Sequence, residues 1–266
     1  MKKSNKGANA VLIIILVYLL IPLAVSIIYS LFSNWTGILP RGFTVQTYVD
    51  LFHDKAFLAS LGRTIVIAII PIIVTIVLIL LALFVTTIYF PRLEKYVQII
   101  CMIPYTIQGV ILSVSILSLY VANPTFLSNR IVMLIGAYCI IILPYIYQGI
   151  RNGMRAVNMP VLLEAAEMLG SSRIYAFFRV IVPNILSAIV VSSLLAVGII
   201  FGDYVLVRNL ASSAWPNVQI YLYQAMKSDS MKSSAVFVVI MAVTFAISAI
   251  VLYLRSREGT HRRVDE

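Results

Sequence analysis

Residues 65 to 87 read IVIAIIPIIVTIVLILLALFVTT and contain no charged side chain. A helix rises 1.5 Å per residue and the hydrocarbon core of a bilayer is about 30 Å thick, so about 20 apolar residues make one crossing. This run is long enough to span a membrane as a helix. A transmembrane β-strand would instead alternate apolar and polar residues over about ten positions, which this run does not do.

Five more uncharged apolar runs share this character, at residues 10–31, 97–121, 131–150, 184–202 and 233–254. The whole chain of 266 residues is 61% hydrophobic and only 11% charged, against about 25% charged in an ordinary soluble domain. The sequence therefore predicts an all-α polytopic membrane protein. We expect about six transmembrane helices in a single transmembrane domain over residues 1–266, with the lipid bilayer as its solvent.

The first apolar run has an alternative interpretation as a secretory signal peptide, because lysines precede it. The run continues past the small residues Ala24 and Ser26 into Ile27 and Ile28, however, and this favours a retained membrane anchor. We therefore count residues 10–31 as the first span.

The formal charge of +10 raises the question of nucleic acid binding. The Lys and Arg residues lie almost entirely outside the apolar runs and form no stripe interleaved with aromatic residues, so nucleic acid is not expected as a partner. With a cytoplasmic N-terminus, the inner segments hold 13 of these residues and the outer segments hold 7. Because inner loops are enriched in Lys and Arg, both termini are predicted to be cytoplasmic.

One stretch between the fourth and fifth spans differs in chemistry from its surroundings. Residues 159 to 183 read MPVLLEAAEMLGSSRIYAFFRVIVP, and they predict a short amphipathic helix that starts near Pro160 and ends at Gly170. A helix lying on lipid is one interpretation, but such helices are rich in Lys and Arg on the polar face. This helix presents Glu164 and Glu167 instead, which favours a protein partner.

The same stretch resembles the cytoplasmic signature of the permeases of binding-protein-dependent ATP-binding cassette importers. That signature is Glu-Ala-Ala, three residues, Gly, nine residues, and Ile-x-Leu-Pro. The matching residues are Glu164, Ala165, Ala166, Gly170 and Pro183. Val180 and Val182 stand where the family has Ile and Leu, which is a conservative departure. Further similarity lies in FTVQTYVDLF (43–52), LPYIYQGIRN (143–152) and FGDYVLV (201–207).

These segments look most like the spermidine/putrescine branch of the type I importers, although branches for iron, aminoethylphosphonate, sulfate and sugars share much of the pattern. The resemblance implies that residues 158–179 form a coupling helix that seats on an ATPase subunit. It also implies two ATPase subunits, a second and non-identical permease subunit, and an extracytoplasmic solute-binding protein. ATP and Mg²⁺ would be bound by those partners, and this chain would be a cofactor-free, non-enzymatic subunit of a bacterial plasma membrane importer that works by alternating access.

Two other classes of membrane protein fit the sequence less well. An intramembrane enzyme would need a catalytic or metal-binding constellation, and the sequence has no His-Glu-x-x-His or Gly-x-Ser-x-Gly motif. Cys101 and Cys139 lie in spans without neighbouring metal ligands, so no metal site is expected. An ion-coupled secondary transporter usually keeps ionisable residues near the middle of the bilayer. The six runs have none, so the energy for transport is expected to come from partner subunits.

A few polar residues in or beside the spans are candidates for the translocation path. Asp203 follows the fifth span directly, where a carboxylate can contact a cationic solute or simply end a helix in water. Its neighbour Tyr204 belongs to the same family-like segment. The secondary candidates are Gln108, Gln148 and Tyr105, with Tyr145 beside them. Hydrogen bonding between helices is the alternative use of these side chains.

Overall fold

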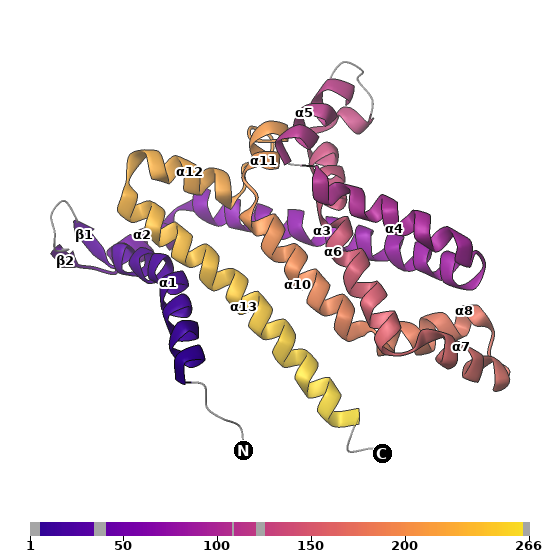
Figure 1. The fold of residues 1–266 in the computed structure, drawn as a ribbon. Coiled ribbons are helices and arrows are strands. Elements are labelled where there is room, and N and C mark those ends of the chain that lie inside the picture. Colours follow the sequence, from indigo (N-terminus) through magenta and orange to yellow (C-terminus); the bar gives the residue numbers. More distant parts are fainter. Residues whose placement is uncertain (1–5, 35–40, 108, 121–125, 263–266) are drawn as a thin grey trace. The chain divides into compact units, whose positions relative to one another are not determined.

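The computed structural model describes residues 6–34, 41–107, 109–120 and 126–262, and most of these residues lie in helices (Figure 1). The described residues divide into two compact units. The first unit contains the chain up to residue 59 and residues 221–243, and the second contains residues 60–220 and the chain from residue 244. Two long helices, α3 (Lys55–Ile88) and α13 (Ser230–Arg262), contribute to both units.

The first unit begins with α1 (Lys6–Ser30), whose apolar side chains are exposed along nearly its whole length. A two-stranded antiparallel sheet of β1 (Phe32–Asn34) and β2 (Arg41–Phe43) follows. The amphipathic helix α2 (Gln46–His53) buries Leu51 and exposes Gln46, Asp50 and His53. An apolar helix surface of this kind suits contact with lipid or with another protein chain.

A polar cluster around Asp54 links three helices of the first unit. The hydroxyl of Tyr221, on α12 (Val218–Ser228), donates a hydrogen bond of 2.6 Å to Oδ2 of Asp54, and Nζ of Lys232 lies 3.3 Å from the same oxygen. Asp54 also accepts the backbone N–H of Ala56 at 2.8 Å, which caps the start of α3. The cluster thus joins α3, α12 and α13.

The second unit contains the remaining helices, which connect end to end with short turns. In chain order after α3 they are η1 (Pro91–Leu93), α4 (Glu94–Met102), η2 (Ile103–Thr106), α5 (Gly109–Tyr120), η3 (Phe126–Ser128), α6 (Arg130–Ala156), α7 (Met159–Met168), α8 (Arg173–Ala176), the π-helical turn η4 (Phe177–Ile181), α9 (Val182–Asn184), α10 (Leu186–Gly202) and α11 (Val205–Leu210). Helix α6 lies at the centre, against α10, α4, α5 and α11.

The side chains that α6 buries recur every three or four residues, as expected for a helix packed on several sides. Leu134, Tyr138, Ile142, Ile146 and Ile150 are all fully buried. The core of the second unit is therefore built around this helix.

The expected all-α polytopic fold is confirmed. In the described part of the chain, four helices are long and apolar enough to cross a membrane, namely α1, α3, α6 and α13. Two bent pairs also pass this test together, so the count reaches six if each pair is one span. The pairs are Pro91–Thr106 with Gly109–Tyr120, and Arg173–Asn184 with Leu186–Gly202.

The sequence did not predict either bend: the first lies within the apolar run 97–121, and the second lies at the start of the run 184–202. The run 97–121 is divided by the 3₁₀ turn η2, which contains Pro104, and a proline removes a backbone donor from a helix. The second pair bends by 63° after Asn184, so the straight part of the fifth span begins at Leu186. The sequence pattern predicted the length of each apolar segment, but it did not predict that the helix changes direction within it.

Candidate functional site

The segment with the family signature leaves α6 and returns to α10. Asn158 has a left-handed backbone conformation, with φ 49° and ψ 57°, and turns the chain out of α6 into α7. Pro160 occupies the first turn of α7, where its missing N–H costs no hydrogen bond. Gly170 ends the helix with φ 82°, a value at which a side chain is strained. The predicted start and end of this helix are therefore where the structure places them.

The exposed side of α7 carries acidic and large apolar side chains. Glu164 and Ala165 are exposed, and Met168 and Leu169 at the end of the helix are 89% and 88% exposed. Ala166 is buried, so it packs inside this chain and only Ala165 of the pair offers a small outward surface. Such exposed apolar side chains on a short, turned-out helix are typical of a protein interface.

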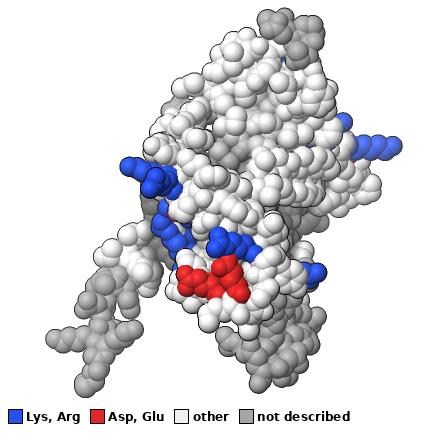
Figure 2. All heavy atoms as spheres, turned by 90° about the vertical axis from the view of Figure 1, so that its right-hand side faces the viewer, with Lys and Arg blue, Asp and Glu red and all other residues white. Residues whose placement is uncertain are grey.

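An ion pair and a hydrogen bond within the segment stabilise its turn. Arg173 forms an ion pair with Glu167 across the turn at Gly170. Ser172 caps α8 by accepting the backbone N–H of Tyr175 at 3.3 Å. On the face seen in Figure 2, the acidic atoms gather in one small patch with basic atoms directly beside them. The exposed Glu164 has no ion-pair partner among the described residues, so its carboxylate can accept donors from another chain.

An aromatic cluster anchors the segment to the end of α3. The Phe84 ring lies 5.0 Å from the Phe177 ring and 5.9 Å from the Phe178 ring, measured between centroids, and Tyr89 adds a third contact at 5.7 Å. Phe177 is completely buried. Sequence reasoning missed this anchor, although the adjacent phenylalanines in an otherwise surface-like segment were a usable signal.

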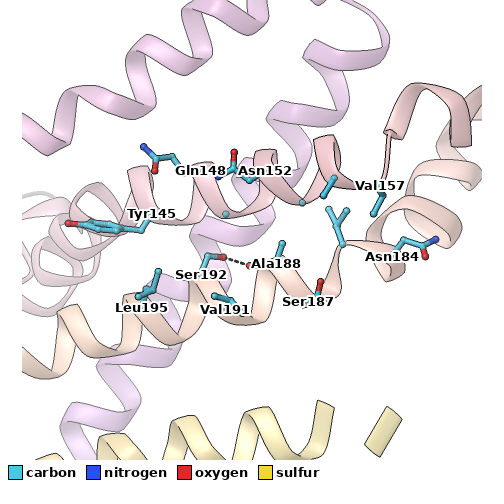
Figure 3. A pocket seen from close by; sticks show the side chains of 14 residues that line it. Tyr145, Gln148, Asn152, Val157, Asn184, Ser187, Ala188, Val191, Ser192 and Leu195 are labelled. Atoms are coloured by element: carbon cyan, nitrogen blue, oxygen red, sulfur yellow. Dashed lines mark hydrogen bonds between the residues drawn. The ribbon is translucent and has the colours of Figure 1, made fainter. Parts of the chain in front are cut away.

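A groove of about 530 Å³ lies between α6 and α10, next to the point where the segment joins them (Figure 3). Its polar side chains are neutral. Tyr145, Gln148 and Asn152 come from α6, Asn184 comes from α9, and Ser187 and Ser192 come from α10. None of the described residues that line it is charged. The groove therefore offers hydroxyl and amide groups, which can both donate and accept hydrogen bonds.

Of the residues predicted for the path, Gln148 lines this groove and Tyr105 contacts a residue that lines it. The Tyr105 ring packs edge-on against Tyr145 with centroids 5.0 Å apart, and Nε2 of Gln148 lies 3.3 Å from Sδ of Met102. These contacts bring the turn η2 and helix α4 to the groove. Gln108 lies outside the described residues.

The other two, Asp203 and Tyr204, lie beyond the opposite end of α10. Oδ2 of Asp203 accepts a hydrogen bond from the Tyr138 hydroxyl at 3.1 Å and another from the backbone N–H of Leu206 at 3.1 Å. The second bond caps α11. The side chain of Asn217 donates to the Asp203 carbonyl oxygen at 3.4 Å. In this structure the carboxylate thus stabilises the turn between α10 and α11.

The chain after α11 is fastened to α3 by bonds that sequence reasoning did not foresee. Nε1 of Trp215 donates to the carbonyl oxygen of Arg63 at 3.1 Å, and the backbone N–H of Val218 donates to Oγ1 of Thr64 at 2.9 Å. These partners are about 150 positions apart in sequence, so no local pattern links them. Among the described residues, no group of three or more His, Cys, Asp or Glu lies close enough to hold a metal ion.

Comparison with known proteins identifies this arrangement. Residues 93–259, more than half of the chain, match the family described as binding-protein-dependent transport system inner membrane component. A protein of Salmonella paratyphi A named as the 2-aminoethylphosphonate transport system permease PhnV is 20% identical over 236 residues, covering 88% of each chain. The spermidine/putrescine transport system permease PotC of Haemophilus influenzae is 22% identical over 255 residues, covering 95% of this chain and 97% of that protein.

A solved structure has the same fold. It is the crystal structure of a bacterial ABC transporter involved in the import of the acidic polysaccharide alginate, and one of its chains matches with a TM-score of 0.73 at 18% identity. The match covers 96% of both chains. The chain described here belongs to the family of binding-protein-dependent transport system inner membrane components and is a permease subunit of an ATP-binding cassette importer.

Proposed function

We propose that this chain forms one half of a solute path, paired with a second and non-identical permease subunit. Two ATPase subunits bind on the cytoplasmic side and supply the energy, and a solute-binding protein delivers the solute from outside. ATP and Mg²⁺ are held by the ATPase subunits, and this chain carries out no hydrolysis. The family assignment supports this division of labour, because its members are membrane components of systems that depend on a binding protein.

The observation that carries the proposal is the exposed end of α7. We call residues 158–179 the coupling segment. Met168 and Leu169 are nearly fully exposed in the isolated chain, and covering one such side chain contributes about 1.5–3 kcal/mol. Glu164 adds an acceptor for basic or backbone donors on the partner. Together they form a compact contact of the kind that an ATPase cleft would receive.

The path works by alternating access. ATP binding closes the ATPase pair and displaces the coupling segment, and the displacement turns the shared path outward to accept solute. Gly170 supports the sharp turn in the segment, and Pro183 lies where the chain passes into the bent entry to α10. The rigid aromatic anchor at Phe84 and Phe177 supports transmission, because it prevents the segment from moving alone.

The proposed orientation places both termini and the coupling segment in the cytoplasm, with residues 32–62 outside, in a bacterial inner membrane. Thirteen of the Lys and Arg residues then lie on inner segments and seven on outer segments. This asymmetry supports the orientation.

The proposed path runs along the neutral groove, with Tyr105 and Gln148 at its rim, and reaches Asp203 and Tyr204 at its outer end. Gln108 is a further proposed residue of the path. The proposed solute carries an amine, as polyamines do. Support comes from the relatives, because spermidine, putrescine and 2-aminoethylphosphonate all bear an amino group. A carboxylate at Asp203 attracts an ammonium group without holding it tightly where water is present.

Uptake into proteoliposomes tests the proposal. The permease pair, its ATPase subunits and its binding protein are reconstituted, and uptake of labelled putrescine, spermidine and 2-aminoethylphosphonate is measured with ATP and with a non-hydrolysable analogue. We expect uptake of an amine-bearing solute only with ATP and binding protein. Uptake driven by an ion gradient without ATP would contradict the proposal.

A further inference from the structure

Helices α6 and α10 approach each other so closely at two points that only glycine fits on α6. A Cβ atom placed on Gly149 would lie 2.4 Å from Cβ of Ser192, and one placed on Gly153 would lie 2.5 Å from Cβ of Ala188. Cβ atoms in proteins essentially never come within 3.0 Å of such a neighbour. Gly149 and Gly153 are one helical turn apart, as are Ala188 and Ser192, so the two pairs form one continuous seam.

Two other glycines in these helices, both exposed, provide a comparison. Gly136 lies on α6 and Gly198 lies on α10, and a Cβ at either position would meet nothing within 4 Å. Glycine in these helices is thus not generally a packing requirement. The four seam residues lie in the halves of α6 and α10 that adjoin the coupling segment.

Both ends of the coupling segment lead to the seam helices, directly into α6 on one side and through η4 and α9 into α10 on the other. Helix α6 ends at Ala156 and the chain enters α7 at Met159, while α9 ends at Asn184 and α10 begins at Leu186. A displacement of the coupling segment therefore acts on both helices at the point where they are pressed together. Without the seam, the two helices could separate and absorb the movement.

The residues of the seam also line the neutral groove. Gly149, Gly153, Ala188 and Ser192 all line it, and Gln148 and Asn152 lie beside the two glycines on α6 (Figure 3). The distance between the helices therefore sets the width of the groove. A change in that distance would alter the spacing of the polar side chains that the solute meets.

From these observations we infer that Gly149 and Gly153 are positioning residues for transport. They make the adjoining ends of α6 and α10 move as one body, and this body carries the displacement of the coupling segment to the groove. The inference rests on the proposed function, and it adds to it the two residues on which transmission depends.

The test uses Gly149→Ala and Gly153→Ala in the complete transporter, measuring solute uptake and ATP hydrolysis in the same proteoliposomes. Alanine favours a helix more than glycine does, so neither change disrupts α6 itself. We expect the number of solute molecules moved per ATP to fall by about tenfold, because the added methyl group forces α6 and α10 to shift at the seam. ATP hydrolysis continues, because the coupling segment still binds the ATPase.

Compensating changes on α10 separate this role from general damage. Two double variants remove from α10 the side chain that the added methyl group would meet: Gly149→Ala with Ser192→Gly, and Gly153→Ala with Ala188→Gly. We expect both double variants to recover most of the uptake per ATP. Gly136→Ala and Gly198→Ala are the matched controls and should behave as the wild type. Recovery in a double variant supports the inference even where a single variant fails to reach the membrane.

Three outcomes distinguish a failure of the inference about Gly149 and Gly153 from a failure of the proposed transport function. Wild-type uptake per ATP in both single variants overturns the inference and leaves the proposed function standing. Single-variant losses that neither double variant restores, with protein present in the membrane at normal amounts, also overturn it. A wild-type transporter without ATP-dependent uptake contradicts the proposed function itself.

Discussion

The Tyr138 hydroxyl donates a hydrogen bond of 3.1 Å to Oδ2 of Asp203, and the same oxygen accepts the backbone N–H of Leu206. One carboxylate oxygen therefore joins the middle of α6 to the first turn of α11. Asp203 has a structural use in addition to the solute contact proposed for it. The two uses depend on different properties of the side chain, since capping needs an acceptor oxygen and solute attraction needs a negative charge.

Asp203→Asn keeps an acceptor oxygen and removes the charge. We expect the variant to fold and to retain ATPase stimulation by the binding protein, while uptake of an amine-bearing solute slows. Tyr138→Phe is the control, because it removes the hydrogen bond and keeps the carboxylate. Rates are measured over a range of solute concentrations. Uptake by Asp203→Asn at the wild-type rate throughout that range would leave only the capping role.

The coupling segment is tested by Glu164→Lys and Gly170→Asp. The first reverses an exposed charge, and the second places a side chain where φ is 82°. A left-handed conformation costs a non-glycine residue about 1–2 kcal/mol, so the turn should shift. We expect uptake to be lost while the permease remains in the membrane at its usual amount, as judged by immunoblotting. Normal uptake in both variants would remove the basis for the coupling role.

The apolar end of α7 should contribute directly to ATPase binding. Leu169→Ser removes an exposed apolar side chain whose burial is worth about 1.5–3 kcal/mol, so affinity for the ATPase should fall by about tenfold or more. Co-purification or binding in detergent measures the change. Met226→Ser, at an exposed position on α12, is the control and should bind as the wild type. Equal affinity in the two variants would place the contact elsewhere.

The orientation predicts which positions are open to the medium outside intact cells. Cys101 and Cys139 are first replaced by serine or alanine, and single cysteines are then introduced as Val45→Cys and Met168→Cys at exposed positions. An impermeant maleimide should label Val45→Cys in intact cells and Met168→Cys only after permeabilisation. The reverse pattern would invert the topology.

The polar cluster around Asp54 predicts a pH dependence of stability. The hydrogen bond from Tyr221 is the largest of the effects that hold the Asp54 pKa below its ordinary value of 3.8. Because the pKa is lowered on folding, the carboxylate stabilises the folded state above that ordinary value, and this contribution is lost as the pH falls through the lowered one. Between pH 7 and pH 5 it should stay constant.

The measurement is the thermal unfolding midpoint of the purified permease in detergent, from pH 7 down to pH 3. Tyr221→Phe should have a lower midpoint than the wild type near neutral pH. Under acidic conditions the difference between the two midpoints should become smaller, since the hydrogen bond from Tyr221 stabilises protonated Asp54 less than the carboxylate. Asp54→Asn removes the titrating group and is the control. A difference between wild type and Tyr221→Phe that is constant across this range would show that Asp54 does not titrate as argued.

Much of the fold could be read from local composition because a bilayer makes local demands. A crossing needs about 20 apolar residues, and each of the six runs meets that condition of length and composition by itself. The start of α7 at Pro160 and its end at Gly170 were also predictable, since proline and glycine act through their own backbone geometry. The match at Glu164, Gly170 and Pro183 identified the family for the same reason, being a pattern within one short segment.

The remaining features depend on contacts between residues far apart in sequence, which no local pattern encodes. Gly149 lies against Ser192, and Tyr138 lies against Asp203. The sequence showed these only as a glycine in an apolar run, a tyrosine inside a span and a carboxylate at a span's end. Which side of a helix each residue occupies, and which helix comes to lie against it, follows from the packing of the whole unit, because close packing is satisfied jointly by all the side chains at an interface. The spans were therefore determined by the sequence, and the seam, the groove and the cap of α11 were decided by the tertiary structure.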